Sequence, residues 1–190
     1  MNRQFCEVVF VPIFVKTPRL TIRRMTMKDA VDIFEYSRDE RVARHVLWSA
    51  HTSIGESRSY IRSMIRRYRA GDAASYAIEF NSTGRVIGTI GFMCYKEEHN
   101  CVEIGYSLSR RYWNQGLMTE AVKAVIDYGF DKLNLHRIEA QHEIDNPASG
   151  AVMRKAGMKY EGRLRQRLMN KGKYVDVDLY AILSDDRRGD

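Results

Sequence analysis

Short strand-like and helix-like segments alternate along this sequence, and their order limits the fold more than any other property of the chain. Period-two alternation predicts strands at residues 20–25, 75–80, 85–95, 101–108 and 136–144. Helical periodicity and capping residues predict helices at residues 26–37, 53–70, 116–132 and 147–156. A final hairpin is expected over residues 158–168 and 174–183, around Asn170-Lys-Gly172. This order predicts a mixed, mostly antiparallel α/β (α+β) sheet flanked by helices, in one domain over residues 1–190.

The length and charge fit a globular protein with an acidic partner. The chain has 190 residues, of which 44% are hydrophobic and 29% charged, and this suits one domain with a sizeable core. Lys and Arg number 31 and Asp and Glu number 24, so the formal charge is +7. A phosphate-bearing cosubstrate, an acidic peptide and RNA all fit this charge, which does not choose among them.

The sequence carries no sign of a membrane span, a disulfide or a metal site. No stretch approaches the roughly 18 apolar residues that a span needs, and Glu7 interrupts the short apolar run of a poor signal peptide at the start. Cys6, Cys94 and Cys101 are odd in number, lack C-x-x-C spacing and have no histidine at zinc-ligand spacing. We therefore expect a cytoplasmic protein without membrane contact or metal, whose cysteines are small buried or half-buried apolar residues, and whose residues 184–190 fray.

One predicted helix carries a dense arginine cluster. Arg58, Arg62 and Arg66 lie four residues apart and share one face, with Arg67 and Arg69 nearby. A separate apolar face follows the spacing i, i+3, i+4 and i+7 at Ile61, Met64, Ile65 and Tyr68. The arginine face is either the solvated side of an amphipathic helix or a steering surface for an acidic target or ribosomal RNA.

The segment from Val102 to Ala121 combines a strand, a basic and aromatic loop and a glycine at a helix entrance. A helix start leaves backbone N–H groups without partners and carries a positive dipole end, so it can hold a diphosphate. Gly116 permits close backbone approach, Thr119 adds a hydroxyl, and Arg110 and Arg111 add positive charge. The alternative is an ordinary turn before a helix, since neither a G-x-G-x-x-G nor a G-K-[ST] pattern is present.

The same segment resembles motif A of the GCN5-related N-acetyltransferases (GNAT superfamily), in the form Tyr112-Trp-Asn-Gln-Gly-Leu-Met-Thr-Glu-Ala121 of the RimJ/RimL-like branch of ribosomal-protein N-acetyltransferases. A second stretch, Asp145-Asn-Pro-Ala-Ser-Gly-Ala-Val-Met-Arg-Lys-Ala-Gly-Met158, resembles the family's N-x-x-S-x-x-x-x-x-K-x-G-[FM] segment. The likeness covers about residues 17–183 and keeps the order of the predicted elements.

This resemblance implies a single-domain GNAT fold with a splayed central strand pair, and acetyl-CoA as the donor for an amine acceptor. The strand before the loop would bind the pantetheine through its main chain, the loop would hold the pyrophosphate, Asn146 would bind the pantetheine, and Ser149 would support the departing thiolate. The implied cofactor-binding residues are Ile104, Tyr106, Ser107, Leu108, Arg110, Arg111, Asn114, Gln115, Gly116, Leu117, Met118, Thr119, Asn146 and Ser149.

The chemistry selects two candidate catalytic residues. The amine must be neutral to attack, and Glu103, near the expected splay, is our candidate base. Its alternative is a strand residue that faces solvent or pairs with an arginine. The leaving thiolate has an ordinary pKa near about 8.5, so one positioned donor is enough, and Ser149 is our candidate for it. Its alternative is an ordinary hydroxyl in the first turn of a helix.

Two positions depart from the wider family. Many members have a tyrosine shortly after the asparagine as general acid, and Met153 stands there in this chain, which leaves acid support to Ser149 or water. Met118 replaces a small residue in the loop, which puts the detailed backbone path of the loop in question. Tyr112 and Trp113 are expected to pack rather than to stack on bases.

The acceptor stays open at this stage. It is either the N-terminal amine of a ribosomal or other protein, or a small amine such as a polyamine, an amino acid or an aminoglycoside. A CoA-binding or ribosome-binding module with weak or no turnover is the non-enzymatic alternative. Two copies pairing through an exposed hairpin or the last strand is a further option.

Overall fold

The computed structural model describes Phe10 and residues 13–187, and these form one eight-stranded sheet with the strand order β1-β2-β3-β4-β5-β6-β8-β7. The strands are β1 (Val15–Lys16), β2 (Leu20–Arg23), β3 (Ser75–Phe80), β4 (Arg85–Lys96), β5 (Cys101–Leu108), β6 (Arg137–Glu143), β7 (Lys159–Asn170) and β8 (Lys173–Leu183). All neighbours pair antiparallel except β5 and β6. The mixed, mostly antiparallel sheet expected from the order of elements is confirmed.

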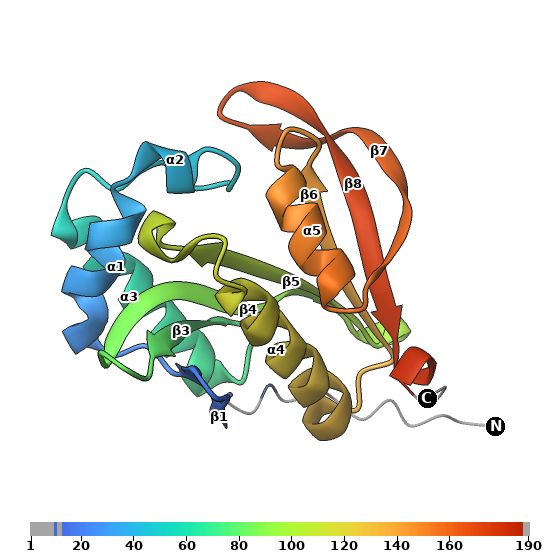
Figure 1. Cartoon of the computed structure of the whole chain (residues 1–190), viewed down its shortest axis with the longest axis horizontal. Coiled ribbons are helices and arrows are strands. Elements are labelled where there is room, and N and C mark those ends of the chain that lie inside the picture. The colour runs from blue at the N-terminus through green and yellow to red at the C-terminus, as the bar shows by residue number, and fades with distance from the viewer. Residues whose placement is uncertain (1–9, 11–12, 188–190) are drawn as a thin grey trace.

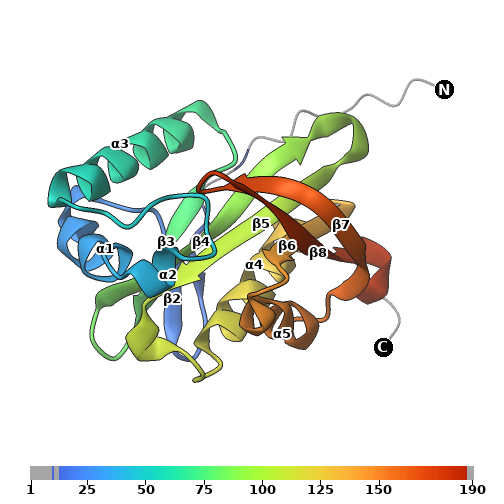
Figure 2. The ribbon, with the colours of Figure 1, turned by 90° about the horizontal axis from the view of Figure 1, so that it is seen from above.

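Helices cover both faces of this sheet (Figures 1 and 2). One face carries α1 (Ala30–Ser37) and α3 (Ile54–Ala70), with the short α2 (Glu40–Ala43) at its end. The other face carries α4 (Leu117–Leu133) and α5 (Pro147–Lys155). None of the helices in the described ranges is long and apolar enough to cross a membrane.

The apolar periodicity of α3 and α4 explains how they pack. In α3, Ile61, Met64 and Tyr68 are buried, as predicted, while its arginines point outward and are exposed. The helix ends at Gly71, whose φ of 73° suits the left-handed conformation that closes a helix. In α4, Leu117 and Val125 lie in the core.

A partly buried ion pair ties β2 to the first helical segment. Arg23 on β2 donates two hydrogen bonds of 2.9 Å to the Asp29 carboxylate, and a third of 2.6 Å to Glu79 on β3. Asp29 also accepts a 2.7 Å hydrogen bond from the Thr26 N–H, so the predicted cap at Thr26 and Asp29 is present. It opens a short 3₁₀ turn at Met27–Asp29, and the α-helix begins one residue later.

The two central parallel strands separate along their length. β5 and β6 pair only at Cys101 with Arg137, Val102 with Ile138 and Glu103 with Glu139. Beyond Glu103, β5 runs to Leu108 and β6 runs to Glu143 without pairing with each other. The splayed strand pair that the resemblance implied is therefore present, and its foot is at Glu103.

Several expectations need correction. The short β1 and α2 were not predicted, because two and four residues are too few to show a period. Residues 184–187 form a 3₁₀ turn instead of fraying, since Asp186 pairs with Lys159 and Arg187 pairs with Asp131. Residues 188–190 lie outside the described residues.

The cysteine expectation holds at one of the two described positions. Cys101 is buried in the core, while Cys94 is exposed where the β4–β5 register shifts, in a left-handed conformation with φ of 50°. Cys6 lies outside the described residues. So does the apolar segment at the start of the chain that was judged a poor signal peptide, except for Phe10.

Candidate active site

The loop between β5 and α4 presents backbone N–H groups at a helix start. Gly116 caps α4 with φ of 74°, and Asn114 in the same loop has φ of 59°. Left-handed residues of this kind turn successive N–H groups toward one side, which suits an anion. Gly116 has no side chain to cap the helix, so the first-turn N–H groups stay available. The side chains of Leu117 and Met118 are buried, so these two residues offer only their backbone.

An arginine and a glutamate fix the path of this loop. The Arg19 guanidinium donates to the Gln115 carbonyl at 2.9 Å and to the Glu120 carboxylate at 2.7 Å. Glu120 accepts two more hydrogen bonds, from the Thr17 hydroxyl at 2.6 Å and the Arg19 N–H at 3.0 Å. Although burial alone would raise it, these hydrogen bonds hold the pKa of Glu120 below its usual range. No local pattern indicates Arg19, because it lies about a hundred residues from its partners.

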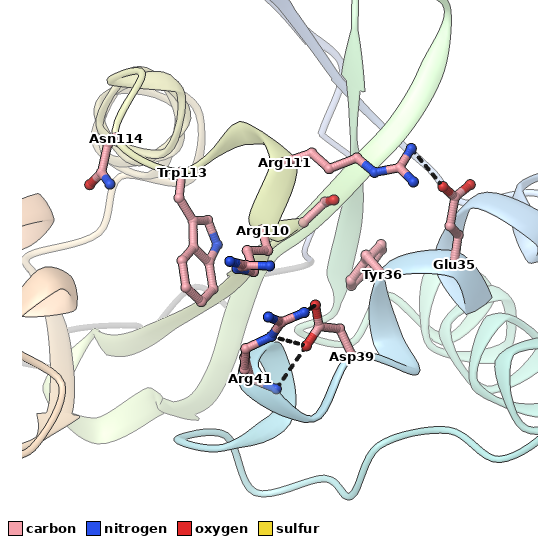
Figure 3. Close-up of a pocket in the computed structure, with 9 residues that line it drawn as sticks. Glu35, Tyr36, Asp39, Arg41, Arg110, Arg111, Trp113 and Asn114 are labelled. Carbon is pink, nitrogen blue, oxygen red and sulfur yellow. Dashed lines mark hydrogen bonds and ion pairs between the residues drawn. The ribbon is translucent and has the colours of Figure 1, made fainter.

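A cavity of about 690 Å³ adjoins the loop on the side of α1 and α2 (Figure 3). Its lining consists of Glu35, Tyr36, Asp39, Arg41, Ser109, Arg110, Arg111, Trp113 and Asn114. Arg41 pairs with Asp39 at 2.9 Å and Arg111 with Glu35 at 3.1 Å, whereas no ion pair joins Arg110 to another described residue. The lining therefore has an excess of positive charge next to the predicted phosphate loop.

The two aromatic residues of the loop behave differently. Tyr112 packs edge-on against Phe80 with ring centroids 5.4 Å apart, as expected. Trp113 is 41% exposed and lines the cavity, and its indole N–H donates to the Leu108 carbonyl at 2.8 Å. The Leu108 carbonyl is thus already bonded, and the Ser107 hydroxyl lies 3.1 Å from that of Thr89 on β4.

Glu103 lies at the foot of the separated strands. Its carboxylate accepts a 3.0 Å hydrogen bond from Gln141 on β6 and stands opposite Glu139 in the register. Burial raises the pKa of Glu103, the hydrogen bond from Gln141 opposes this shift, and the nearby Glu139 charge adds to it. A half-buried carboxyl with a raised pKa is suited to accept a proton near neutral pH.

The start of α5 faces β5 across the separated strands. The Ser149 hydroxyl lies 2.9 Å from the Tyr106 hydroxyl, which also donates toward the Ser149 carbonyl at 3.1 Å. Asn146 precedes the helix, and no side-chain hydrogen bond caps the helix there. Met153, at the position where many relatives have a tyrosine, is 1% exposed and packs in the core.

A cluster of polar residues around Glu143 lies at the end of β6, and the sequence analysis did not predict it. His45 Nδ1 lies 2.7 Å from Glu143 Oε2, and the Asn170 amide donates to the other oxygen of Glu143. Lys171 donates to the carbonyls of Ala43 at 3.0 Å and Val46 at 2.7 Å. The turn of the β7–β8 hairpin is thereby joined to the segment after α2, a contact that no local pattern announces.

Comparison with known proteins gives the family. The model of the acetyltransferase (GNAT) domain matches residues 19–159, which is more than half of the chain. The chain belongs to the GNAT family. It is 35% identical to the uncharacterized N-acetyltransferase p20 of Bacillus licheniformis, over 91% of this chain and 97% of that protein. A GNAT-family acetyltransferase from Bacillus anthracis superposes with a TM-score of 0.82 at 29% identity, over 91% and 99% of the two chains.

The chain is a GNAT-type N-acetyltransferase, and enzymes of the RimJ/RimL-like branch are among the proteins that it resembles. A relative in that branch is the [ribosomal protein uS5]-alanine N-acetyltransferase of Escherichia coli, 28% identical over 90% of both chains. GNAT enzymes use acetyl-CoA, so acetyl-CoA is the cosubstrate. The residues of the site fit acetyl-CoA chemically. The N–H groups at the start of α4 and the nearby arginines can bind phosphates, and the part of β5 that does not pair with β6 can bind the amide groups of the pantetheine. No group of three or more His, Cys, Asp or Glu residues in the described part of the chain is arranged to hold a metal.

Proposed function

We propose that this GNAT enzyme acetylates the N-terminal amine of a protein, with Glu103 as base and Ser149 as donor to the leaving sulfur. The observation that carries the proposal is the position of Glu103, a half-buried carboxyl with a raised pKa at the foot of the separated strands. When bound, acetyl-CoA supplies the thioester whose acetyl group is transferred. The proposed setting is the cytoplasm, where ribosomal proteins offer N-terminal amines; one relative is named as a [ribosomal protein uS5]-alanine N-acetyltransferase.

The cosubstrate would be held mainly by backbone groups. In this proposal the N–H groups of residues 114–119 bind the pyrophosphate, and Arg110 and Arg111 add positive charge beside it. The main chain of Ile104 and the residues after it, which have no partner on β6, binds the amide groups of the pantetheine, together with the Asn146 side chain.

Glu103 would take the proton of the attacking amine, directly or through one water. Its raised pKa makes it a stronger base than an exposed glutamate, and Gln141 orients the carboxylate. The strand N–H groups near Tyr106 would stabilise the negative charge that grows on the acetyl oxygen. The Ser149 hydroxyl would donate a hydrogen bond to the departing sulfur.

Two features favour a macromolecular acceptor on or near the ribosome. Relatives in this branch include enzymes named for ribosomal proteins. The arginine face of α3 is exposed on the outside of the molecule and could hold an acidic surface. A polyamine, an amino acid or an aminoglycoside is the competing acceptor class.

The test compares acceptors by release of free thiol from acetyl-CoA. Peptides that copy ribosomal-protein N-termini should be turned over faster than polyamines, amino acids and aminoglycosides. Mass spectrometry of ribosomal proteins from a deletion strain should then show one N-terminus that has lost its acetyl group. Turnover of small amines alone, with an unchanged ribosomal spectrum, would contradict the protein acceptor.

Two structural expectations remain proposals. We treat the chain as one working domain, because all eight strands belong to one sheet. Pairing of two copies would involve β7, which is an edge strand.

A further inference from the structure

Two hydroxyl groups meet across the separated strands. Tyr106 lies on β5, three residues beyond the last residue that pairs with β6, and Ser149 lies in the first turn of α5. Their hydroxyl oxygens are 2.9 Å apart, and the Tyr106 hydroxyl is 3.1 Å from the Ser149 carbonyl oxygen. The side chain of Tyr106 therefore reaches the same residue that the proposed function gives to the leaving sulfur.

The hydrogen atoms of this pair have two consistent arrangements. When the Tyr106 hydroxyl donates to the Ser149 carbonyl, the Ser149 hydroxyl can donate back to Tyr106, and both hydrogens are used. When the Tyr106 hydroxyl donates to Ser149 Oγ, the hydrogen of Ser149 is free to point elsewhere. Rotation of two O–H bonds exchanges the arrangements, and no heavy atom needs to move.

Tyr106 is suited to donate and to keep its proton. Burial raises the pKa of its phenol, and the hydrogen bond with Ser149 only partly opposes the shift. Helix α5 offers no phenol of its own at this point, because Met153 stands where many relatives have tyrosine. A neutral phenol on β5 thus supports the α5 hydroxyl from the opposite side.

We propose that Tyr106 is a positioning residue, whose hydroxyl donates to Ser149 Oγ and so directs the Ser149 O–H at the leaving sulfur. This inference rests on the proposed function. In the transfer, the carbon–nitrogen bond forms and Glu103 accepts the amine proton. The carbon–sulfur bond breaks with its electron pair on sulfur. Ser149 and Tyr106 keep their protons and share them as hydrogen bonds, and water supplies the proton that turns the thiolate into a thiol.

The experiment measures binding and needs no turnover. Calorimetry gives dissociation constants for CoA and desulfo-CoA at pH 6.5, where the CoA thiol is protonated, and at pH 9.5, where a substantial share of it is thiolate. Desulfo-CoA has no thiol, so the ratio of the two constants cancels the effects of the other charged and polar groups packed around α5, which include His142 on β6, Arg154 on α5 and Tyr180 on β8. In the wild type, the affinity for CoA relative to desulfo-CoA should be about tenfold higher at pH 9.5 than at pH 6.5, because a hydrogen bond to a charged thiolate is stronger than one to a neutral thiol. We call this increase in relative affinity the gain.

Three variants test the role of Tyr106. Ser149→Ala should abolish the gain, Tyr106→Phe should reduce it at least about threefold, and the double variant should match Ser149→Ala because Tyr106 acts through Ser149. Tyr68→Phe is the matched control. Tyr68 lies on α3, is buried, and donates its hydroxyl hydrogen to the Ser75 carbonyl. The Tyr68→Phe variant should leave the gain unchanged.

Each outcome decides something. A full gain in Tyr106→Phe overturns the inference, and so does a weakening that is equal for both ligands at both pH values, which would mean a purely structural role. A further loss in the double variant overturns action through Ser149. If wild type binds both ligands without a gain at pH 9.5, the inference fails alone. If it binds neither, the proposed function fails with it.

Discussion

At the scale of single residues, burial and hydrogen bonding set what each carboxyl can do. Glu103 is half-buried, accepts a hydrogen bond from an amide and lies opposite a second glutamate, so its pKa is raised although the charges of Arg167 and Lys96 oppose the shift. Asp29 is also buried, yet it meets an arginine and two backbone or hydroxyl donors of Thr26, so its pKa is lowered. The same functional group is thus prepared for proton transfer in one place and for structural support in the other.

Replacing Glu103 with Gln should lower kcat/KM about a hundredfold to a thousandfold, because a general base contributes on this order. In the wild type, activity should fall as the pH drops through the raised pKa of Glu103, since the protonated carboxyl cannot accept a proton. The Glu103→Gln variant should lose this limb of the pH profile. Glu98→Gln, at an exposed glutamate, is the control, and an unchanged profile in Glu103→Gln would remove Glu103 as the base.

Replacing Asp29 with Asn should destabilise the fold by roughly 2–4 kcal/mol, because Arg23 would keep a half-buried charge with one partner fewer. The folded-state pKa of Asp29 lies below its unfolded value. Its contribution is therefore fully present above the unfolded-state pKa and is lost as the pH falls through the folded-state pKa. Urea unfolding should show a larger difference between wild type and variant at pH 7 than at pH 3. Asp72→Asn, in an exposed turn, should show little at either pH.

At the scale of elements, the loop before α4 depends on a strand far away in the sequence. Arg19 precedes β2 and binds both the Gln115 carbonyl and Glu120, so it fixes the backbone whose N–H groups, in the proposed function, would bind the pyrophosphate. In that proposal the guanidinium shapes the loop and does not itself bind a phosphate.

Arg19→Ala should therefore raise the dissociation constant of CoA about threefold to tenfold in calorimetry, with a small loss of thermal stability, because the loop must be ordered on binding. Arg163→Ala removes an arginine that pairs with Asp178 across the β7–β8 hairpin and should leave CoA affinity unchanged. Equal affinities of the two variants would show that Arg19 does not shape the loop.

Local patterns predicted most of the elements and part of the site. The predicted strands and the helices α3, α4 and α5 agree with the structure to within a few residues, because each is long enough to show its period or has a clear cap. The loop at Gly116 was predicted as a phosphate site from residue type and order, and Glu103 was predicted as the base from the splay that the resemblance implied; the structure places Glu103 at the foot of that splay. Arg19, His45 and Tyr106's contact with Ser149 depend on which strands and helices meet in space, and local sequence carries no record of that.

At the scale of the whole molecule, the turn of the β7–β8 hairpin closes onto the segment after α2. Lys171 holds the carbonyls of Ala43 and Val46, and Asn170 holds Glu143 (Figure 2 shows the hairpin beside this segment). The Lys171 contacts join two parts of the chain that are more than a hundred residues apart. Because Glu143 is the last residue of β6, they lie at the open end of the separated strands, and we propose that an acceptor enters beside them.

Lys171→Ala should loosen this closure. Hydrogen exchange should rise in residues 43–46 and in the hairpin turn, because the backbone carbonyls lose their donor. KM for the acceptor should rise several-fold while CoA affinity stays unchanged. Lys173→Ala, on the same hairpin and exposed, is the control, and equal exchange in both variants would contradict the closure.

The three-residue pairing between β5 and β6 has a mechanical consequence. Strands β1–β5 and strands β6–β8 are two plates of one sheet, and only a short seam of backbone hydrogen bonds joins them directly. A ligand bound between these two parts of the sheet would contact both of them and hold them together. Saturating CoA should then raise the melting temperature and slow hydrogen exchange on both sides of the seam, so the cosubstrate would complete the architecture as well as feed the reaction.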